Sequence, residues 1–227
     1  MVNDISALEQ LPKLFFKDHV LPIQLIFFVT TRCNASCAHC FYAAELNNPL
    51  KKDMSLEEIE KFSQTLDKML LLYLAGGEPF LRTDLPEIAE IFYRNNDVRI
   101  FGIPTNGFLP QIMLPSIERM CQKCPDANIL VNISIDDIGE AHEVFRKVPG
   151  GWKRLLETVA GIKELKKKYK NLALGTNCTF NGFNQDKIMD IYYYLRDEIQ
   201  PDSININLVR GKPKDPHSSE IDISKYH

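Results

Sequence analysis

The sequence lacks three features that would place it in a particular class of protein. No apolar stretch approaches the ~18 residues that a membrane-spanning helix needs, so we predict no membrane span. The N-terminal residues MVNDISALEQLPKLFF contain no basic region followed by an apolar one, which argues against a secretory signal. Charge of one sign is not in excess: 27 basic and 30 acidic side chains give a net charge of -3, so neither nucleic acid nor anionic lipid is expected as the main partner. We therefore expect a cytoplasmic protein.

Low-complexity segments, internal linkers and sequence repeats are also missing. The 227 residues are 44% hydrophobic and 25% charged, which are ordinary values for a globular protein and exclude disorder and fibrous repeats. Chain length alone allows one or two domains, but α/β barrels of ~200–250 residues form a single domain.

Short β-rich runs alternate with segments of helical periodicity along the chain. The runs carry Val, Ile, Leu and Phe between Gly, Pro, Asn or Asp, which is typical of strands. We predict strands at about 25–30, 71–75, 98–103, 129–135, 171–179 and 203–209. Their spacing, about 31 residues, is the size of a βα unit in a parallel sheet. Eight such units need ~250 residues, so we predict an α/β fold, a partial (β/α)6 TIM-like barrel with parallel strands.

Five helices are predicted between these strands. The first begins at the capping box Ser55–Glu58 and continues to Met69 at helical spacing. The others are indicated by apolar residues at helical spacing within 85–92, 113–120, 152–165 and 188–195. Asn184 is the predicted N-cap of the last helix.

The chain divides into three predicted parts: a leader at 1–24, the partial barrel at 25–215, and a polar segment at 216–227. The polar segment begins soon after the sixth strand, where a covering helix would be expected. No cysteine follows Cys178. We therefore expect residues 216–227 to be the start of an extension that is missing from this sequence.

Three of the six cysteines, Cys33, Cys37 and Cys40, lie within eight residues just after the first predicted strand. Clustered cysteines in a reducing compartment bind metal or do redox chemistry more often than they form disulfides. Three thiolates can hold three irons of a [4Fe–4S] cluster and leave the fourth iron open for chemistry. The alternative is a Cys3His zinc site that uses His39 or a distant residue, although structural zinc sites usually have paired CxxC arms.

The other three cysteines have a simpler interpretation. Cys121 and Cys124 form a CxxC near the end of the third predicted helix, which is the wrong end to stabilise a thiolate. We interpret both as ordinary, partly buried cysteines, and we interpret Cys178, which lies in a predicted strand, as a core residue.

Four further motifs follow the strands in order. They are Ala75-Gly76-Gly77-Glu78-Pro79-Phe80 after the second strand, Thr105-Asn106-Gly107 after the third, Ser134-Ile135-Asp136 with His142 and Arg146 at the end of the fourth, and Asn207-Leu208-Val209-Arg210-Gly211 at the end of the sixth. Together with CxxxCxxC, this series resembles the radical S-adenosylmethionine enzymes, in the subgroup whose members often carry a SPASM or twitch extension. The resemblance covers roughly residues 20–215.

The resemblance implies that residues at the strand ends bind a cluster and a cofactor. Cys33, Cys37 and Cys40 would ligate a [4Fe–4S] cluster, whose open iron would be chelated by the amino and carboxylate groups of S-adenosylmethionine. The backbone of Gly76 and Gly77 would receive the amino group, with Glu78 nearby. Glycines allow the backbone to come close to a ligand, and an ammonium group favours carbonyl and carboxylate neighbours.

Further residues are implied contacts of the same cofactor. Arg146 would pair with the cofactor carboxylate, which suits a guanidinium fork, and Ser134 would hydrogen-bond the carboxylate or the ribose. Asn177 would contact the ribose or the substrate. Tyr42 and Leu208 would line the adenine pocket.

Most of these residues also have a purely structural interpretation. The alternatives are a plain strand-to-helix turn for Gly76 and Gly77, a solvated loop charge for Arg146, a strand-end turn hydroxyl for Ser134, and core positions for Tyr42 and Leu208. His39 is interpreted as a packing or hydrogen-bonding residue and Asp136 as a cap of the following turn, outside the predicted site.

The resemblance implies an enzyme that reductively cleaves S-adenosylmethionine to a 5′-deoxyadenosyl radical, which abstracts hydrogen from a substrate. A reducing partner such as flavodoxin or ferredoxin would supply the electron, and a peptide or protein is one candidate substrate. The alternative is a non-enzymatic zinc or iron–sulfur module that serves as a partner or electron-transfer surface. The GGEP motif and the pair Ser134 and Arg146 favour the enzyme, because a purely structural metal site would not need them.

Overall fold

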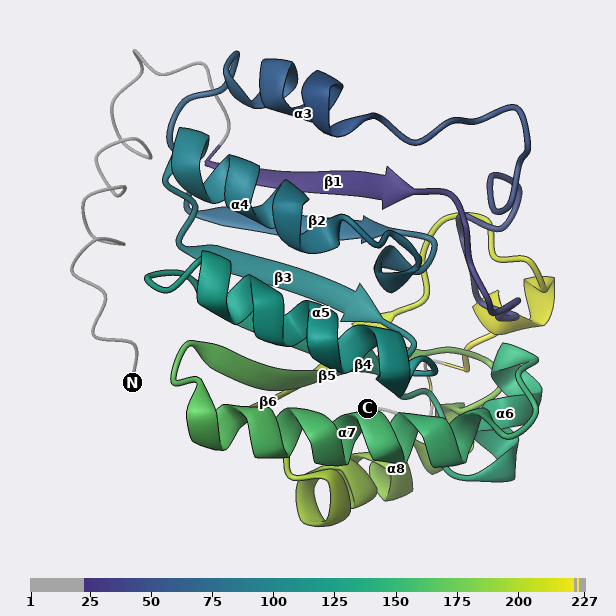
Figure 1. Cartoon of the computed structure of the whole chain (residues 1–227). Helices are drawn as coiled ribbons and strands as arrows, with labels where there is room; N and C mark the ends of the chain where they lie inside the picture. Colours follow the sequence, from purple (N-terminus) through teal and green to yellow (C-terminus); the bar gives the residue numbers. More distant parts are fainter. Residues whose placement is uncertain (1–22, 223, 225–227) are drawn as a thin grey trace.

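A computed structural model describes residues 23–222 and 224 of the chain. Six parallel strands form one sheet in the order β1-β2-β3-β4-β5-β6, each strand pairing with the next along the chain (Figure 1). The strands are β1 (Gln24–Thr30), β2 (Leu71–Gly76), β3 (Ile100–Thr105), β4 (Asn128–Ser134), β5 (Leu172–Phe180) and β6 (Ser203–Leu208). The predicted fold class, a partial (β/α)6 barrel of parallel strands, is confirmed.

Helices cover one face of this sheet (Figure 1). They are α3 (Leu56–Ser63), α4 (Leu85–Asn96), α5 (Pro110–Lys123), α7 (Gly151–Lys168) and α8 (Ile188–Tyr194), with a short α6 (Glu140–Arg146) beyond the end of β4. Buried apolar residues of the helices, such as Phe92 and Ile117, meet buried strand residues such as Leu74, Phe101 and Val131 in one core. Burial of this apolar surface holds the helical layer to the sheet.

The register of the strands sorts their side chains into two sets. Parallel pairing aligns Leu72 with Phe101 and Phe101 with Ile129, and all three are buried under the helices. Because successive strand residues point to opposite sides, their neighbours Tyr73 and Gly102 face the other way. We call this second side, opposite the helices, the inner face of the sheet.

The first predicted helix is shorter than the sequence indicated. The capping box of Ser55 and Glu58 begins α3 as predicted, but the helix ends at Ser63 instead of near Met69. The Asn96 side chain explains this end, because its amide donates to the carbonyl oxygens of Ser63, Leu66 and Asp67. A side chain from α4 therefore satisfies carbonyls that a longer helix would have used itself.

Two other local predictions need correction. The short helix α6 was not predicted, because its seven residues hold few apolar side chains and its Val144 is 70% exposed. Asn184 was predicted to cap the last helix. Instead it precedes a 3-10 turn at Gln185–Lys187, and its side chain donates to the carbonyl oxygens of Asp136 and Thr179.

The three buried cysteines follow the prediction. Cys121 and Cys124 lie at the end of α5 and are buried, and Cys178 is buried in β5. Burial raises the pKa of both Cys121 and Cys124 to about 12, so these thiols stay protonated at neutral pH. They act as small apolar side chains.

The ends of the chain are described only in part. Most of the predicted leader, residues 1–22, lies outside the described residues. At the other end, a 3-10 turn at Pro216–Ser219 packs on the loop after β5, where the Gly182 amide donates to the Ser218 carbonyl over 3.0 Å. No described helix is both long enough and apolar enough to cross a bilayer.

Candidate functional site

The loop that carries the three clustered cysteines begins where β1 ends, at the carboxyl edge of the sheet. Asn47 holds its first part: the Cys33 amide donates to Asn47 Oδ1 over 3.0 Å, and Asn47 Nδ2 donates to the Cys33 carbonyl over 3.1 Å. All three thiols are free and half-buried. Sites of parallel α/β folds are built at this edge, where loops from several strands meet.

The middle of the cysteine loop is held between two distant segments. The amides of Ser36 and Ala38 donate to the carbonyl oxygens of Arg146 and Phe145 at the end of α6, over 3.1 and 3.3 Å. From the other side, the segment after β6 contributes the Asp215 amide, which donates to the Ala38 carbonyl over 2.8 Å. The loop is thereby fixed from two sides, and within it the Cys40 amide donates to the Cys37 carbonyl over 3.3 Å.

A pocket of about 180 Å³ opens beside two of the cysteines. Its lining includes Cys37, Cys40 and Lys214, whose ammonium group donates to the Ser36 hydroxyl. Burial raises the pKa of the Cys33 thiol to about 11 and also raises the pKa of Cys37, while the positive charge of Arg146 opposes the rise at Cys37. No three His, Cys, Asp or Glu side chains of the described residues are grouped as ligands of one metal ion.

The glycine pair after β2 lies against the start of the cysteine loop. The Gly77 amide donates to the Thr30 carbonyl over 2.9 Å, and the Glu78 amide donates to the Arg32 carbonyl over 2.8 Å. A Cβ atom on Gly77 would lie 2.1 Å from the Arg32 carbonyl oxygen, and Gly76 has a φ of +122°. Both positions therefore require glycine so that the two backbones can approach.

Glu78 is buried and its carboxylate is surrounded by donors. Oε1 accepts from Thr105 Oγ1 over 2.8 Å and from the Phe80 amide over 3.2 Å, and Oε2 accepts from the Asn106 amide over 2.8 Å. Asn106 Nδ2 in turn donates to Asn34 Oδ1 in the cysteine loop over 2.7 Å. Glu78 thus organises the ends of β2 and β3 and, through Asn106, reaches the cysteine loop.

Replacing Glu78 by glutamine is expected to lower the free energy of unfolding by about 1–3 kcal/mol. Either orientation of the new amide turns its NH2 group toward a backbone N–H, of Phe80 or of Asn106, and leaves that buried donor unpaired. Urea denaturation of both proteins measures the difference. The exposed Glu57→Gln change on α3 is the control, and a loss at Glu78 no larger than at Glu57 would contradict the expectation.

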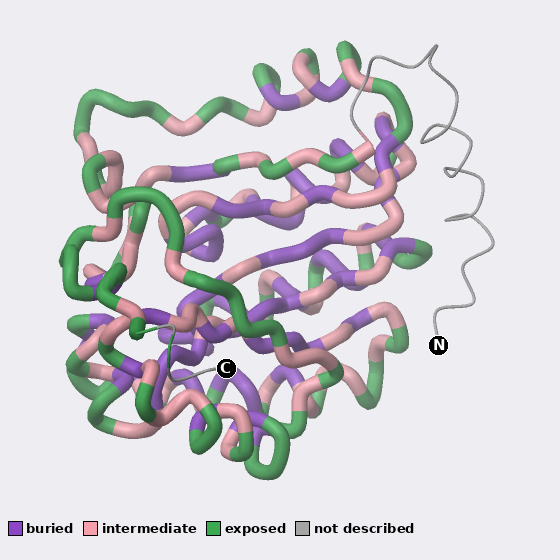
Figure 2. The backbone as a smooth tube through the Cα atoms, turned by 180° about the vertical axis from the view of Figure 1, so that it is seen from behind, coloured by how far each residue is buried: buried purple, intermediate pink, exposed green. Residues whose placement is uncertain are grey.

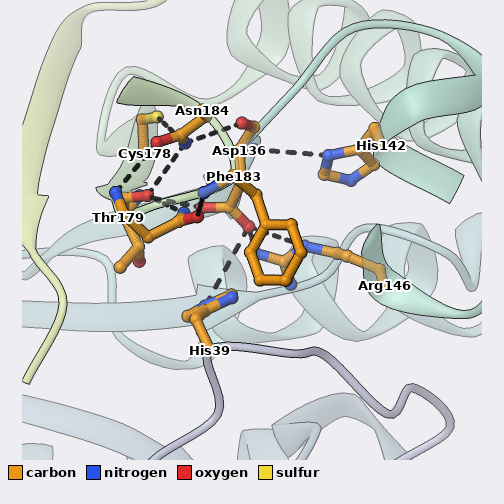
Figure 3. Close-up of polar contacts among 9 residues, drawn as sticks. His39, Asp136, His142, Arg146, Cys178, Thr179, Phe183 and Asn184 are labelled. Carbon is orange, nitrogen blue, oxygen red and sulfur yellow. Dashed lines mark hydrogen bonds and ion pairs between the residues drawn. The ribbon is translucent and has the colours of Figure 1, made fainter. Parts of the chain in front are cut away.

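Asp136 is the centre of a buried polar cluster at the ends of β4 and β5 (Figure 3). Its Oδ2 accepts from Nε and Nη2 of Arg146 over 3.0 and 2.5 Å, and its Oδ1 accepts from the Thr179 amide over 2.8 Å. His39 Nε2 lies 4.0 Å from Oδ2. Burial alone would raise the pKa of Asp136, but the charge of Arg146 outweighs it and leaves the pKa at about 2.

His142 joins this cluster as a neutral side chain. Its Nδ1 accepts from the Asp136 amide over 3.3 Å, and its ring meets Phe108 and Trp152 edge-on. Burial, followed by the nearby charge of Arg146, lowers the pKa of His142 to about 3. The ring therefore carries no charge in the native protein at neutral pH.

The histidine gives the protein a defined sensitivity to acid. In the unfolded chain His142 binds a proton near pH 6.5, whereas in the native chain it does not. The contribution of His142 to stability is therefore complete above pH 6.5 and is lost as pH falls toward 3. Between pH 7 and pH 5 this amounts to about 2 kcal/mol. We expect the stability difference between the wild type and His142→Gln to shrink by that amount over this range in urea titrations. A stability difference between the two proteins that stays constant from pH 7 to pH 5 would contradict this expectation.

The predicted site residues lie in several places around this edge. Ser134 and Asn177 are register partners on β4 and β5, and both side chains are on the inner face. The Tyr42 ring meets Phe28 edge-on, with 4.9 Å between ring centroids. Leu208, the last residue of β6, is 66% exposed. The proposed contacts of these four residues with a cofactor stay predictions.

Sequence reasoning missed part of this arrangement. Asp136 was interpreted as a cap, yet it binds Arg146 and so connects β4 to α6. The spacing of Asp136, His142 and Arg146 along the chain was a usable signal, because a short helix brings residues four apart to one side. The contact of Asn106 with Asn34 had no such signal, since it joins separate loops. The contact of Asn47 with Cys33 had none either, since the two residues lie 14 apart in the irregular connection between β1 and α3.

Comparison with known proteins supports one family. The family model of the Radical SAM superfamily matches residues 27–195. A probable GTP 3′,8-cyclase of Methanococcus aeolicus is 32% identical over 71% of this chain and 52% of its own length. A serine-type anaerobic sulfatase-maturating enzyme of Bacteroides thetaiotaomicron is 29% identical over 73% of this chain and 41% of its own.

A solved structure shows the same fold. It is described as native anSMEcpe with bound AdoMet and Cp18Cys peptide, and it superimposes with a TM-score of 0.63 at 21% identity, covering 86% of this chain and 54% of that one. This chain spans about half or less of the length of the curated relatives that it matches. The family match covers well over half of the sequence, and the chain therefore belongs to the Radical SAM superfamily.

Proposed function

We propose that this chain is the catalytic core of an enzyme that generates a radical from S-adenosylmethionine. The observation that carries the proposal is the cysteine loop: three free thiols lie at the carboxyl edge of the sheet, between α6, the segment after β6 and the glycines that follow β2. Enzymes of this superfamily use a [4Fe–4S] cluster and S-adenosylmethionine. Cys33, Cys37 and Cys40 would hold the cluster.

The donor set fits such a cluster. Three thiols match three iron ligands, and none of them is committed to a disulfide. Burial raises the pKa of Cys33 and Cys37, so both thiols would have to release their protons on binding iron. When bound, the cluster would supply one electron for breaking the S–C5′ bond of S-adenosylmethionine, which gives methionine and the 5′-deoxyadenosyl radical.

The residues of the chain would bind and orient the cofactor. Arg146 uses Nε and Nη2 on Asp136, and a guanidinium has five N–H donors, so donors remain for the cofactor carboxylate. Asp136 fixes the guanidinium in place. The backbone of Gly76 and Gly77, with Glu78 behind it, would receive the amino group, and Ser134, Tyr42 and Leu208 would complete the pocket. Asn177 would contact the ribose or the substrate.

A peptide or protein is the substrate that we favour. Among the described residues, β1 and β6 each have one strand partner, so the described sheet is open beyond them, and such an opening would admit a large substrate. The similarity to a sulfatase-maturating enzyme and to a solved structure with a bound peptide supports this choice. The similarity to a probable GTP 3′,8-cyclase supports a nucleotide as the second candidate.

The same proposal includes the surroundings of the enzyme. A flavodoxin or ferredoxin would deliver the electron. The protein would work in the cytoplasm, where six unpaired cysteines would stay reduced.

Anaerobic reconstitution tests the proposed function. We expect about four irons per chain, an EPR signal of the dithionite-reduced protein that changes when S-adenosylmethionine is added, and release of 5′-deoxyadenosine. Alanine at Cys33, Cys37 or Cys40 should abolish all three, whereas Cys121→Ala should retain them. Zinc at one per chain, with no signal that depends on the cofactor, would support the metal-binding module instead.

A further inference from the structure

The inner face of the sheet carries no Asp, Glu, His, Lys or Arg side chain at any strand position that the register places there. Figure 2 shows the molecule from this side, opposite α4, α5 and α7. The side chains of a strand alternate between its faces, so the content of this face follows from the observed register. A substrate that lies against these strand positions meets only neutral side chains, and the charged Asp136 and Arg146 lie beyond the end of β4.

The neutral face has two different halves. On β1 and β2 it is apolar, with Ile26 and Phe28 51% and 40% exposed and Tyr73 beside them in register. On β5 and β6 it is polar, with Asn177 opposite Asn205. A ligand that bridges the halves needs an apolar part on one side and hydrogen-bonding groups on the other.

The polar half contains two buried groups that have no partner. Asn132, which is only 3% exposed, and Ser203 flank Gly175 in register. Asn132 Oδ1 and Ser203 Oγ are both buried and make no hydrogen bond. A Cβ atom on Gly175 would lie 2.1 Å from Asn132 Oδ1 and 3.0 Å from Ser203 Oγ, so the glycine leaves room for both groups.

Unpartnered buried groups of this kind indicate a ligand, because a native structure rarely leaves them unsatisfied. A carboxamide oxygen accepts an N–H, and a serine hydroxyl both donates and accepts. A peptide group offers one N–H donor and one C=O acceptor. Asn132 and Ser203 therefore complement a peptide group in hydrogen-bonding type.

We propose that Asn132 and Ser203, with Asn177 and Asn205 on the same face, form a subsite that binds a neutral amide of the substrate, and that the apolar half of the face takes an adjoining apolar side chain. The inference rests on the proposed function and narrows its substrate to an uncharged peptide segment. A nucleoside triphosphate is disfavoured, since phosphate oxygens are bound by Arg, Lys or arrays of backbone N–H, and the inner face offers no such cation.

Titration of the ¹⁵N-labelled full chain with N-acetyl-leucine methylamide tests the subsite. This probe has two amides and one apolar side chain, and NMR follows the side-chain amide signals of Asn132, Asn177 and Asn205. We expect these signals to shift, and we expect Asn132→Ala or Ser203→Ala to raise the Kd by about 3- to 10-fold. Asn128→Ala, on the same strand and face but at its far end, should keep the wild-type Kd.

Charged probes complete the test. N-acetyl-glutamate methylamide and tripolyphosphate should bind more weakly than the leucine probe, and neither should shift the Asn132 signal. Tripolyphosphate binding at these residues would favour the nucleotide and overturn the proposal. So would an unchanged Kd in both variants, provided their spectra are as dispersed as that of the wild type, or the absence of any shift with the leucine probe.

The measurement separates this inference from the proposed function. Spectra are recorded before and after cluster reconstitution, and binding of the probe requires neither the cluster nor S-adenosylmethionine. If the cofactor is cleaved and the probe does not bind, only the subsite is wrong. If the probe binds and no cluster assembles, the proposed radical chemistry is wrong while the amide site remains.

Discussion

Replacing Asp136 by alanine is expected to lower the free energy of unfolding by about 3–5 kcal/mol. The change leaves the buried Arg146 guanidinium without its carboxylate and the Thr179 amide without its acceptor. A charge that stays buried without a partner costs much more than the pair contributes. Urea denaturation followed by circular dichroism measures the loss.

A neighbouring residue provides the matched control. Asp137 is also buried, but its partner Lys187 is half-exposed and can turn to solvent, and its carboxylate accepts only one further bond, from the Ile138 amide, so Asp137→Ala should cost about 1–2 kcal/mol. The double variant Asp136→Leu with Arg146→Met removes both buried charges and should lose less than the single Asp136→Ala variant. If Asp136→Ala and Asp137→Ala lowered the free energy of unfolding equally, the buried pair of Asp136 and Arg146 would not be a major contributor to stability.

Replacing Gly77 by alanine is expected to cost about 3–5 kcal/mol and to displace the start of the cysteine loop. The new Cβ would lie 2.1 Å from the Arg32 carbonyl oxygen and 2.7 Å from its carbonyl carbon, and backbone atoms cannot move aside as a flexible side chain can. The hydrogen bonds that the Gly77 amide donates to the Thr30 carbonyl and the Glu78 amide donates to the Arg32 carbonyl would both be strained. Thermal and urea denaturation give the stability change, and iron content after reconstitution gives the effect on the loop.

Gly139 is the matched glycine for this experiment. Unlike Gly77, it has a positive φ, +62°, but a Cβ there would meet nothing within 4 Å. Gly139→Ala should therefore lose about 1–3 kcal/mol, from backbone conformation alone, and keep its iron. If Gly77→Ala lost no more stability than Gly139→Ala, the close approach of the two backbones would not be what requires glycine after β2.

Several features of the fold could be predicted because they depend on neighbours in the sequence. Alternating apolar runs located the six strands, with β3 the least accurate, since it begins at Ile100 instead of near residue 98. The capping box placed the start of α3 correctly. The end of α3 was missed because it depends on Asn96, more than 30 residues away, whose side chain donates to the Ser63 carbonyl. The boundaries of the three predicted parts stay predictions.

In the candidate site, too, features set by neighbours in the sequence could be predicted and contacts between distant residues could not. The sequence located the cysteine loop, the glycine pair and Arg146, because each is part of a short motif at the end of a strand. It gave no indication that Glu78 would be buried under donors from β3 or that Asp136 would hold Arg146. Those contacts join residues that are close only after the strands have paired.

The sequence by itself determined the order of parallel strands and helices, the place of the thiols at the carboxyl edge, and the family, since these follow from periodicity and from spacing within a few residues. Only the tertiary structure decided which side chains share a face. A register one residue different would have turned Asn132 and Asn177 toward the helices and brought buried aliphatic residues to the inner face. The neutral inner face and the buried Asp136 cluster are therefore products of packing between distant segments.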